Sequence, residues 1–179
     1  FLLMVFLCLS QFSFAQQDLI EEIVVTGSYI KTSSKNDTSP VDIILRDEID
    51  GIGAFLASDI IKNLSINSGS ENNTDAFTSG STQGTSNINL RGLGLSSTLV
   101  LIDGRRQTVT GATANDGSVF VNTSTIPLIA IQRVEVLKEG AASIYGSDAV
   151  AGVVNYIFRR DFKGFELDIS DKRTDAGNQ

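Results

Sequence analysis

The chain has 179 residues, of which 41% are hydrophobic, and it carries a formal net charge of −7. That length and apolar content suit one domain of ordinary size with a buried core. The acidic balance, without a long run of Lys or Arg, argues against a nucleic-acid partner, because phosphate binding requires clustered cations. With one cysteine and no histidine, the chain has neither a disulfide framework nor the commonest general base and metal ligand.

Residues 1–15 are apolar and uncharged, and they end in Ser13, Phe14 and Ala15, which have the small-x-small form of a signal-peptidase site. We predict a signal peptide here, with Gln16 as the mature N-terminus. A membrane anchor is the alternative, but this run is shorter than the roughly 20 residues that a spanning helix needs. The chain opens on Phe1 without a basic segment, so we expect the signal peptide to be truncated at its start.

A short β-branched run precedes a polar stretch near the N-terminus. Its members are Glu21, Glu22, Ile23, Val24, Val25 and Thr26. Residues 31–39 are Ser, Thr, Lys, Asn and Asp, closed by Pro40, which is the composition of a flexible linker. One interpretation is an edge strand or a frayed terminus without a role. The other is a tethered strand kept available for the sheet edge of another protein.

The folded part is expected to begin with a strand at 41–45, rich in branched residues. Apolar residues then recur at helical spacing over 54–64, which predicts an amphipathic helix that covers a sheet, with Asp47 or Asp50 as a possible cap before it. Residues 65–87 and 108–122 are rich in Ser, Thr, Asn and Gly. Loops of that length in a compact domain are either functional or solvated surface.

Between these loops, residues 88–90 alternate like a strand and run into a glycine turn, and 98–102 form a continuous apolar strand buried on both faces. The spacing Gly92-x-Gly94 is only a weak phosphate-loop signal, because no Walker lysine follows. Asp103 and Gly104 are predicted to form a turn after the second strand, with Asp103 as a turn former rather than a catalytic acid.

Towards the C-terminus, Pro127 suits the start of a short helix at 128–131. A strand is predicted at 133–137 with one buried face and one solvent-exposed face, and the exposed face carries Arg133 and Glu135. A helical turn at 141–145 and a strand at 153–158 follow. Residues 159–163 read as a charged hinge, and 164–170 alternate like a further strand that has no partner after it.

The segment I-Q-R-V-E-V-L-K-E-G-A-A-S-I-Y-G-S-D-A-V-A-G-V-V-N-Y-I, at 131–157, resembles the closing segment of the plug domain of TonB-dependent outer-membrane receptors. Glu139 is one extra residue before Gly140. The runs E-E-I-V-V-T-G-S at 21–28, L-R-G at 90–92 and L-V-L-I-D-G-R at 99–105 resemble further motifs of that family in the expected order. The Pro-Gly pair that follows the helix in plug domains is missing after Leu64.

The resemblance implies an α+β fold: a small mixed β-sheet flanked by short helices, with long loops. It divides the chain into the signal peptide at 1–15, a TonB box and flexible linker at 16–40, and a plug domain at 41–158. Residues 159–179 would be a hinge and the start of the first strand of a transmembrane β-barrel that this chain lacks. The implied location is the cell outer membrane, with the TonB box facing the periplasm.

The implied function is energy-coupled uptake of a scarce nutrient (siderophore, cobalamin, haem or oligosaccharide), without a cofactor. The partners would be the C-terminal domain of TonB in the TonB–ExbB–ExbD system, which would bind 21–26, and the receptor's own barrel. Arg91 and Arg133 would pair with barrel acids, or else be exposed strand charges of small energetic consequence. The loop residues that could contact the nutrient are Asp75, Phe77, Gln83, Asn115, Asp116 and Phe120.

Two other classes of protein share some of these sequence features. A soluble secreted or periplasmic binding module with a plug-like fold would have the same signal and loops, but it would give the strand at 21–26 no role. A glycosidase would need two carboxylates facing one cleft, and Glu135 and Glu139 lie too near each other along a strand and turn. The sequence has no coherent catalytic constellation, so we expect no enzymatic activity.

Overall fold

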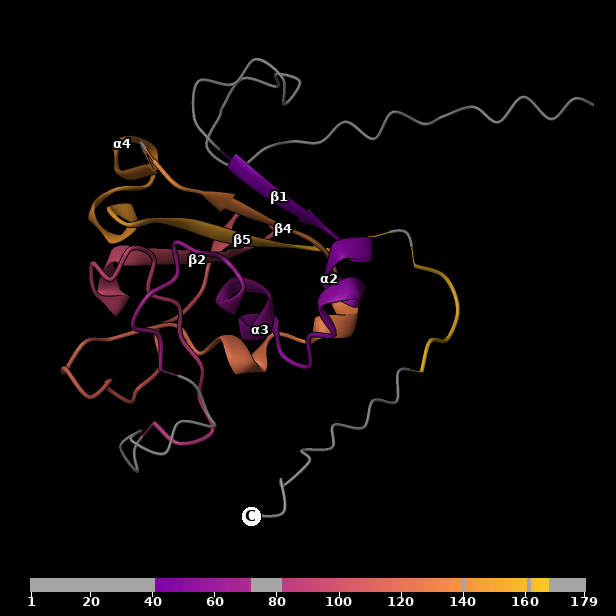
Figure 1. Ribbon diagram of the computed structural model, residues 1–179, viewed down its shortest axis with the longest axis horizontal. Coiled ribbons are helices and arrows are strands. Elements are labelled where there is room, and N and C mark those ends of the chain that lie inside the picture. The colour runs from indigo at the N-terminus through magenta and orange to yellow at the C-terminus, as the bar shows by residue number, and fades with distance from the viewer. Residues whose placement is uncertain (1–40, 72–81, 140, 161, 168–179) are drawn as a thin grey trace, which may run out of the picture.

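The computed structural model describes residues 41–71, 82–139, 141–160 and 162–167. At its centre is one five-stranded sheet in the order β1-β4-β5-β2-β3 (Figure 1). The strands are β1 (Val41–Leu45), β2 (Thr98–Ile102), β3 (Arg105–Arg106), β4 (Ile131–Leu137) and β5 (Gly152–Phe158). β2 and β5 are parallel and the other neighbouring pairs are antiparallel. The predicted mixed sheet is confirmed.

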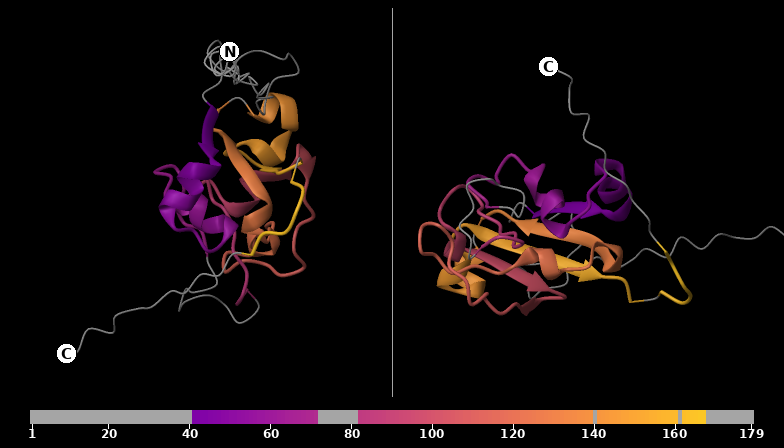
Figure 2. Two further views of the ribbon diagram at one scale, coloured as in Figure 1. Left: turned by 90° about the vertical axis from the view of Figure 1, so that its right-hand side faces the viewer. Right: turned by 90° about the horizontal axis from the view of Figure 1, so that it is seen from below.

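Short helices cover both faces of this sheet. The α-helices are α2 (Arg46–Ile52), α3 (Ala57–Lys62) and α4 (Ala141–Tyr145), and the 3₁₀ helices are η1 (Leu95–Ser97), η2 (Thr123–Thr125), η3 (Leu128–Ala130) and η4 (Ser147–Ala149). Figure 2 shows α2 and α3 on one side of the sheet and α4 on the other. The helical turn predicted at 141–145 is confirmed, and the short helix after Pro127 ends one residue earlier than predicted.

The larger core lies between the sheet and α2 and α3. Ile44, Val134 and Tyr156 are paired across β1, β4 and β5, so their side chains form one row on this face. Ile60 and Ile61 of α3 are fully buried in the same cluster. The Tyr156 hydroxyl, buried beneath α3, donates a hydrogen bond to the carbonyl oxygen of Ala57 at 3.3 Å. This bond satisfies the polar end of an otherwise apolar contact between helix and sheet.

A smaller core lies on the opposite face. Leu99, Leu137 and Val153 form a buried cluster there with Ala141 of α4 and Ala149 of η4. β2 therefore contributes to both cores, because Val100 belongs to the larger one. The prediction that 98–102 is buried on both faces is confirmed.

The prediction that β4 has a solvent-exposed face is wrong. Glu135 is 0% exposed and lies opposite Ile43 of β1 and Asn155 of β5. Its Oε1 accepts a hydrogen bond from Arg133 Nε at 2.9 Å, and the Arg133 side chain is only 13% exposed. Apolar and polar residues do alternate along β4. A two-residue period in the sequence, however, cannot distinguish a solvent-exposed face from a face that buries an ion pair.

The single helix predicted at 54–64 is also wrong in its extent. Within 54–64 there is one shorter helix, α3, and α2, which was not predicted, precedes it. Gly53 ends α2 in the left-handed conformation, with φ of 65°. The carboxylate of Asp59 accepts hydrogen bonds from the N–H groups of Phe55 and Leu56, at 3.1 and 3.0 Å, so α3 begins only at Ala57. Neither Asp47 nor Asp50 caps a helix, because both lie inside α2.

The pKa of Asp59 reflects that capping position. Burial alone would raise this pKa, but hydrogen bonds from the Lys62 side chain and from the Leu56 and Phe55 N–H groups outweigh burial and lower it. The carboxylate therefore stays ionised at the start of α3, where the helix dipole also favours a negative charge.

The strand predicted at 88–90 does not form, apart from one bridge between Asn67 and Leu90. Main-chain bonds run from the Ser68 N–H to the Asn89 carbonyl oxygen and from the Asn87 N–H to the Glu71 carbonyl oxygen, but side chains accept the bonds of the Asn89 and Leu90 N–H groups. The Asn89 N–H donates to Asn67 Oδ1 at 3.2 Å and to Ser70 Oγ at 3.0 Å, and the Leu90 N–H donates to Thr98 Oγ1 at 3.1 Å. Likewise, the described residues 162–167 contain no strand, and the rest of the segment predicted at 164–170 lies outside the described part.

The turn between β2 and β3 is confirmed. Asp103 and Gly104 both have positive φ, at 49° and 75°, as a two-residue hairpin turn that follows the twist of its strands requires. The Asp103 carboxylate accepts a hydrogen bond from the Phe158 N–H at 3.1 Å. The turn thus connects β2 to β3 and also binds the last residue of β5.

Candidate functional site

The predicted TonB-binding residues at 21–26 lie outside the described residues, and so do Asp75 and Phe77. Of the other predicted ligand contacts, Gln83, Asn115 and Asp116 are exposed on loops. Phe120 is only 2% exposed and packs with Leu95 and Ala114 in a small cluster of their own. Its side chain supports the loop from inside, and its position speaks against contact with a ligand.

Asn115 and Asp116 lie at the tip of a rigid turn at 113–119, closed by a bridge between Thr113 and Val119. Asp116 accepts two hydrogen bonds from Ser118, one from its N–H and one from its hydroxyl, both at 2.8 Å. These bonds lower the pKa of Asp116. The tip therefore presents a fixed negative charge to its surroundings.

The loops around this tip are joined to one another by asparagine side chains. Asn122 Oδ1 accepts hydrogen bonds from the N–H groups of Ser86 and Ser124, both at 3.1 Å. The Thr123 N–H donates to the carbonyl oxygen of Ser86 at 2.8 Å. Hydrogen bonds thus join loop segments that are far apart in the sequence, and these loops lie on the side of β2 away from β1 (Figure 1).

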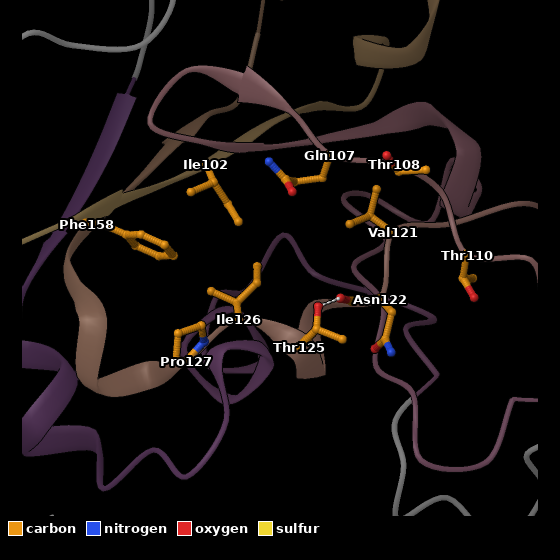
Figure 3. Close-up of a pocket in the computed structure, with 10 residues that line it drawn as sticks. All are labelled: Ile102, Gln107, Thr108, Thr110, Val121, Asn122, Thr125, Ile126, Pro127 and Phe158. Carbon is orange, nitrogen blue, oxygen red and sulfur yellow. Dashed lines mark hydrogen bonds between the residues drawn. The ribbon is translucent and has the colours of Figure 1, made fainter.

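A pocket of about 440 Å³ opens beside these loops, with Asn122 in its lining (Figure 3). Its apolar wall is formed by Ile102 and Phe158, at the ends of β2 and β5, together with the side chains of Val121, Ile126 and Pro127. Gln107, Thr108, Thr110, Asn122 and Thr125 supply the polar groups of the lining. All ten lining side chains are uncharged.

Arg91 is exposed and has a φ of 58°. One of its guanidinium nitrogens lies 3.9 Å from a carboxylate oxygen of Glu139, which is the residue inserted before Gly140. Both side chains are well exposed, so this pair contributes little to stability. Arg91 therefore remains accessible to a second acidic partner, whereas Arg133 is held by Glu135 within the domain.

Four residues that organise this region were not predicted from the sequence: Glu71, Asn87, Asn89 and Asn122. Each takes part in a hydrogen bond between a backbone N–H and a side-chain oxygen, and these bonds link loop segments that form no regular β-ladder. The available signal was the recurrence of Asn in loop segments that also contain buried apolar residues, such as Ile88 and Leu90. Asparagine is common in such positions because its amide can mimic the backbone.

Within the described ranges, no helix is long and apolar enough to cross a membrane. The same residues contain no group of three acidic, cysteine or histidine side chains placed to hold a metal ion.

The family described as TonB-dependent Receptor Plug Domain matches residues 33–153. Among solved structures, a variant of the ferric enterobactin receptor PfeA from Pseudomonas aeruginosa, in complex with enterobactin, is similar at 27% identity with a TM-score of 0.52, over 69% of this chain and 18% of that chain. A second PfeA variant is similar at 28% identity with a TM-score of 0.50, over the same shares of both chains. This chain thus spans less than a fifth of these receptors.

The family match begins before β1 and extends into β5, so it includes nearly the whole sheet. The mixed sheet with short helices is the plug fold, and the family consists of transport receptors rather than enzymes. On this evidence, the chain belongs to the plug-domain family of TonB-dependent receptors.

Proposed function

We propose that this chain is the plug portion of an outer-membrane receptor that imports a scarce nutrient, using energy delivered by TonB. The observation that carries the proposal is the family match over 33–153 together with the plug fold. The similar solved structures are receptors for ferric enterobactin, which supports a siderophore as cargo. Cobalamin, haem and oligosaccharide are the other candidates.

The proposed organisation follows from the order of segments. Residues 1–15 direct export, 16–40 carry the TonB box and its linker, 41–158 form the plug domain, and 159–179 lead into the first strand of a barrel. The receptor would lie in the outer membrane with its TonB box on the periplasmic side. In support, the described sheet begins at Val41 and its last strand ends at Phe158.

The proposed TonB contact is a strand join at 21–26. Main-chain hydrogen bonds between an extended peptide and a sheet edge provide affinity without demanding a particular side chain. A β-branched run is suited to this role because its residues favour the extended conformation. The polar residues of 31–39 would allow the strand to reach TonB while the plug remains folded.

The exposed loop residues Gln83, Asn115 and Asp116 are the proposed cargo contacts. Their support is exposure and a shared surface, since hydrogen bonds join the loops that carry them. Arg91 is the proposed contact between plug and barrel, because its pair with Glu139 is long and exposed. Arg133 is the weaker candidate of the two, since its guanidinium group already pairs with Glu135.

The test is binding of the chain to a TonB C-terminal domain, measured by biolayer interferometry. The unmodified chain is expected to bind, and Val24→Pro is expected to weaken binding at least tenfold, because proline removes a donor from the joined strand. Thr38→Pro, in the linker, is the matched control and should leave binding unchanged. Equal binding by both variants would instead favour a soluble module in which 21–26 has no role.

A further inference from the structure

Glu71 makes contacts to two loops that are far apart in the sequence. Its N–H donates a hydrogen bond to Asn87 Oδ1 at 2.7 Å, and its carbonyl oxygen accepts one from the Asn87 N–H at 3.1 Å. Its side-chain Oε1 accepts a third from the Asn115 N–H, also at 3.1 Å. The main chain of Glu71 is therefore bound to one loop and its side chain to the other.

The structure held by the carboxylate is the turn at 113–119, which carries the exposed Asn115 and Asp116. The turn is internally rigid, because Asp116 binds Ser118 twice and the Ala114 N–H donates to the Ser118 carbonyl oxygen at 2.9 Å. At the base of the turn the attachment is apolar, through the cluster of Leu95, Ala114 and Phe120. Glu71 supplies a polar attachment at the tip.

The second carboxylate oxygen of Glu71 is buried and has no hydrogen-bond partner among the described residues. Within the same part of the chain, the buried amide nitrogen of Asn87 is also without a partner. Buried polar atoms in native structures are nearly always paired, and an exception calls for an explanation. Here Glu71 can accept a further donor, such as a hydroxyl or an amide N–H, while it still holds Asn115.

We propose that Glu71 is a positioning residue that couples the two loops. A change at the Asn115–Asp116 tip would be passed through its carboxylate to Asn87, and from there to the segment that enters the core at Leu90. The coupling gives the plug a route by which cargo contact at one loop alters the other. This inference rests on the proposed function, because it treats these loops as the cargo-facing surface.

The first test is amide hydrogen exchange of the ¹⁵N-labelled chain, read at Asn115 by NMR. Glu71→Ala is expected to speed exchange at Asn115 about tenfold, because a hydrogen bond to a charged acceptor is lost. Glu71→Gln should have a smaller effect, since the amide oxygen can still accept a neutral hydrogen bond. Glu48→Gln, which alters an exposed acid of α2, is the matched control and should not affect Asn115.

The second test separates coupling from simple stabilisation by a double-mutant cycle with Asp116→Ala, which removes the bonds to Ser118. Exchange at the Asn87 N–H should respond to Asp116→Ala when Glu71 is present and should not respond in Glu71→Ala. If Glu71→Ala does not fold, the cycle is run with Glu71→Met, which keeps the length of the side chain but has no oxygen to accept the bond from Asn115. A purely additive cycle, or unchanged exchange at Asn115 in Glu71→Ala, would overturn the proposal.

These measurements do not depend on TonB. Loss of coupling with intact TonB binding would reject the role of Glu71 alone, and absence of TonB binding with intact coupling would reject the proposed function alone.

Discussion

Gly152, the first residue of β5, is the glycine at which substitution by alanine is expected to lower the free energy of unfolding most. Its φ is +141°, a conformation that residues with side chains rarely adopt. A Cβ atom there would lie 2.6 Å from the carbonyl oxygen of Leu137 and 2.8 Å from Cδ1 of Leu90. Leu137 pairs with Val153 in the ladder between β4 and β5, so its carbonyl oxygen cannot withdraw without disturbing the sheet.

The expected cost of Gly152→Ala follows from these two effects. Overpacking in a filled core costs about 1–3 kcal/mol, and an unfavourable backbone conformation adds about 1–3 kcal/mol. The free energy of unfolding should therefore fall by about 2–6 kcal/mol. Since natural domains are stable by only about 5–15 kcal/mol, the variant would lie near the limit of folding.

The assay is urea unfolding followed by far-ultraviolet circular dichroism, because the chain has no tryptophan. With a urea dependence of about 1–3 kcal/mol per molar, the midpoint should fall by about 1 M or more. Gly51→Ala is the matched control, since no atom lies within 4 Å of a Cβ at that position. Alanine favours the helix there, so the control should gain about 0.5–1 kcal/mol.

A loss of less than about 1 kcal/mol in Gly152→Ala would refute the reasoning, because either effect alone predicts at least that much. If the variant does not fold, the double variant Gly152→Ala/Leu90→Ala removes the side-chain clash and keeps the clash with the Leu137 carbonyl oxygen. It should remain less stable than Leu90→Ala alone.

Two further predictions concern the ends of the sheet and its core. Asp103→Ala should lower the free energy of unfolding, measured by thermal unfolding, by about 1–2 kcal/mol. The variant loses the hydrogen bond from the Phe158 N–H, and alanine must still adopt the positive φ of this position. Asp103→Asn should be nearly neutral, because asparagine tolerates a positive φ and its side-chain oxygen can still accept the bond. Burial raises the pKa of Tyr156 well above its ordinary value of 10.0. The folded state thus keeps a proton that the unfolded chain loses, so this contribution is complete below about pH 10 and falls as pH rises above it. Tyr156→Phe should remove that loss and cost about 0.5–1.5 kcal/mol at neutral pH, measured by urea unfolding at several pH values.

The elements predicted best from the sequence are those in which the local residue pattern and the tertiary packing favour the same conformation. Both ends of β1 and of β2 were predicted correctly, because each is a branched apolar run bounded by polar or glycine residues. The turn at Asp103 was also predictable, since the Asp-Gly pair favours the two positive φ values that a tight hairpin needs. In these segments local propensity and tertiary packing have the same preference.

The pattern failed where side chains replace the backbone as hydrogen-bond partners. Residues 88–90 alternate like a strand, yet Asn67, Ser70 and Thr98 take their hydrogen bonds. Likewise, Asp59 starts α3 three residues later than the apolar spacing indicated. The bonds from Asn89 join residues 22 and 19 positions apart, which no local spacing reveals. The bonds to Asp59 are local, but they depend on a polar side chain that the apolar spacing leaves out of account.

The exposure of the candidate loops was predictable from their composition, and the arrangement of their side chains was not. The polar composition of two loops marked them as candidates, and Asn115 and Asp116 are indeed exposed. Phe120 was grouped with them because aromatic residues often contact ligands, but it is buried against Leu95. The contact from Glu71 to Asn115 spans 44 residues, so it follows only from the fold.

Glu135 is a buried acid in the middle of β4, and its charge is paired within the same strand. In the observed register Glu135 faces Asn155 of β5 and binds Arg133. A slip of two residues would keep every side chain on its own face, but it would place the carboxylate opposite Val153 or Ile157. A buried charge without a partner costs several kcal/mol, but Arg133, two residues away on the same strand, would remain the partner of Glu135 after such a slip. The ion pair therefore makes the burial of Glu135 tolerable, and the side chains packed on the two faces of the sheet set the register.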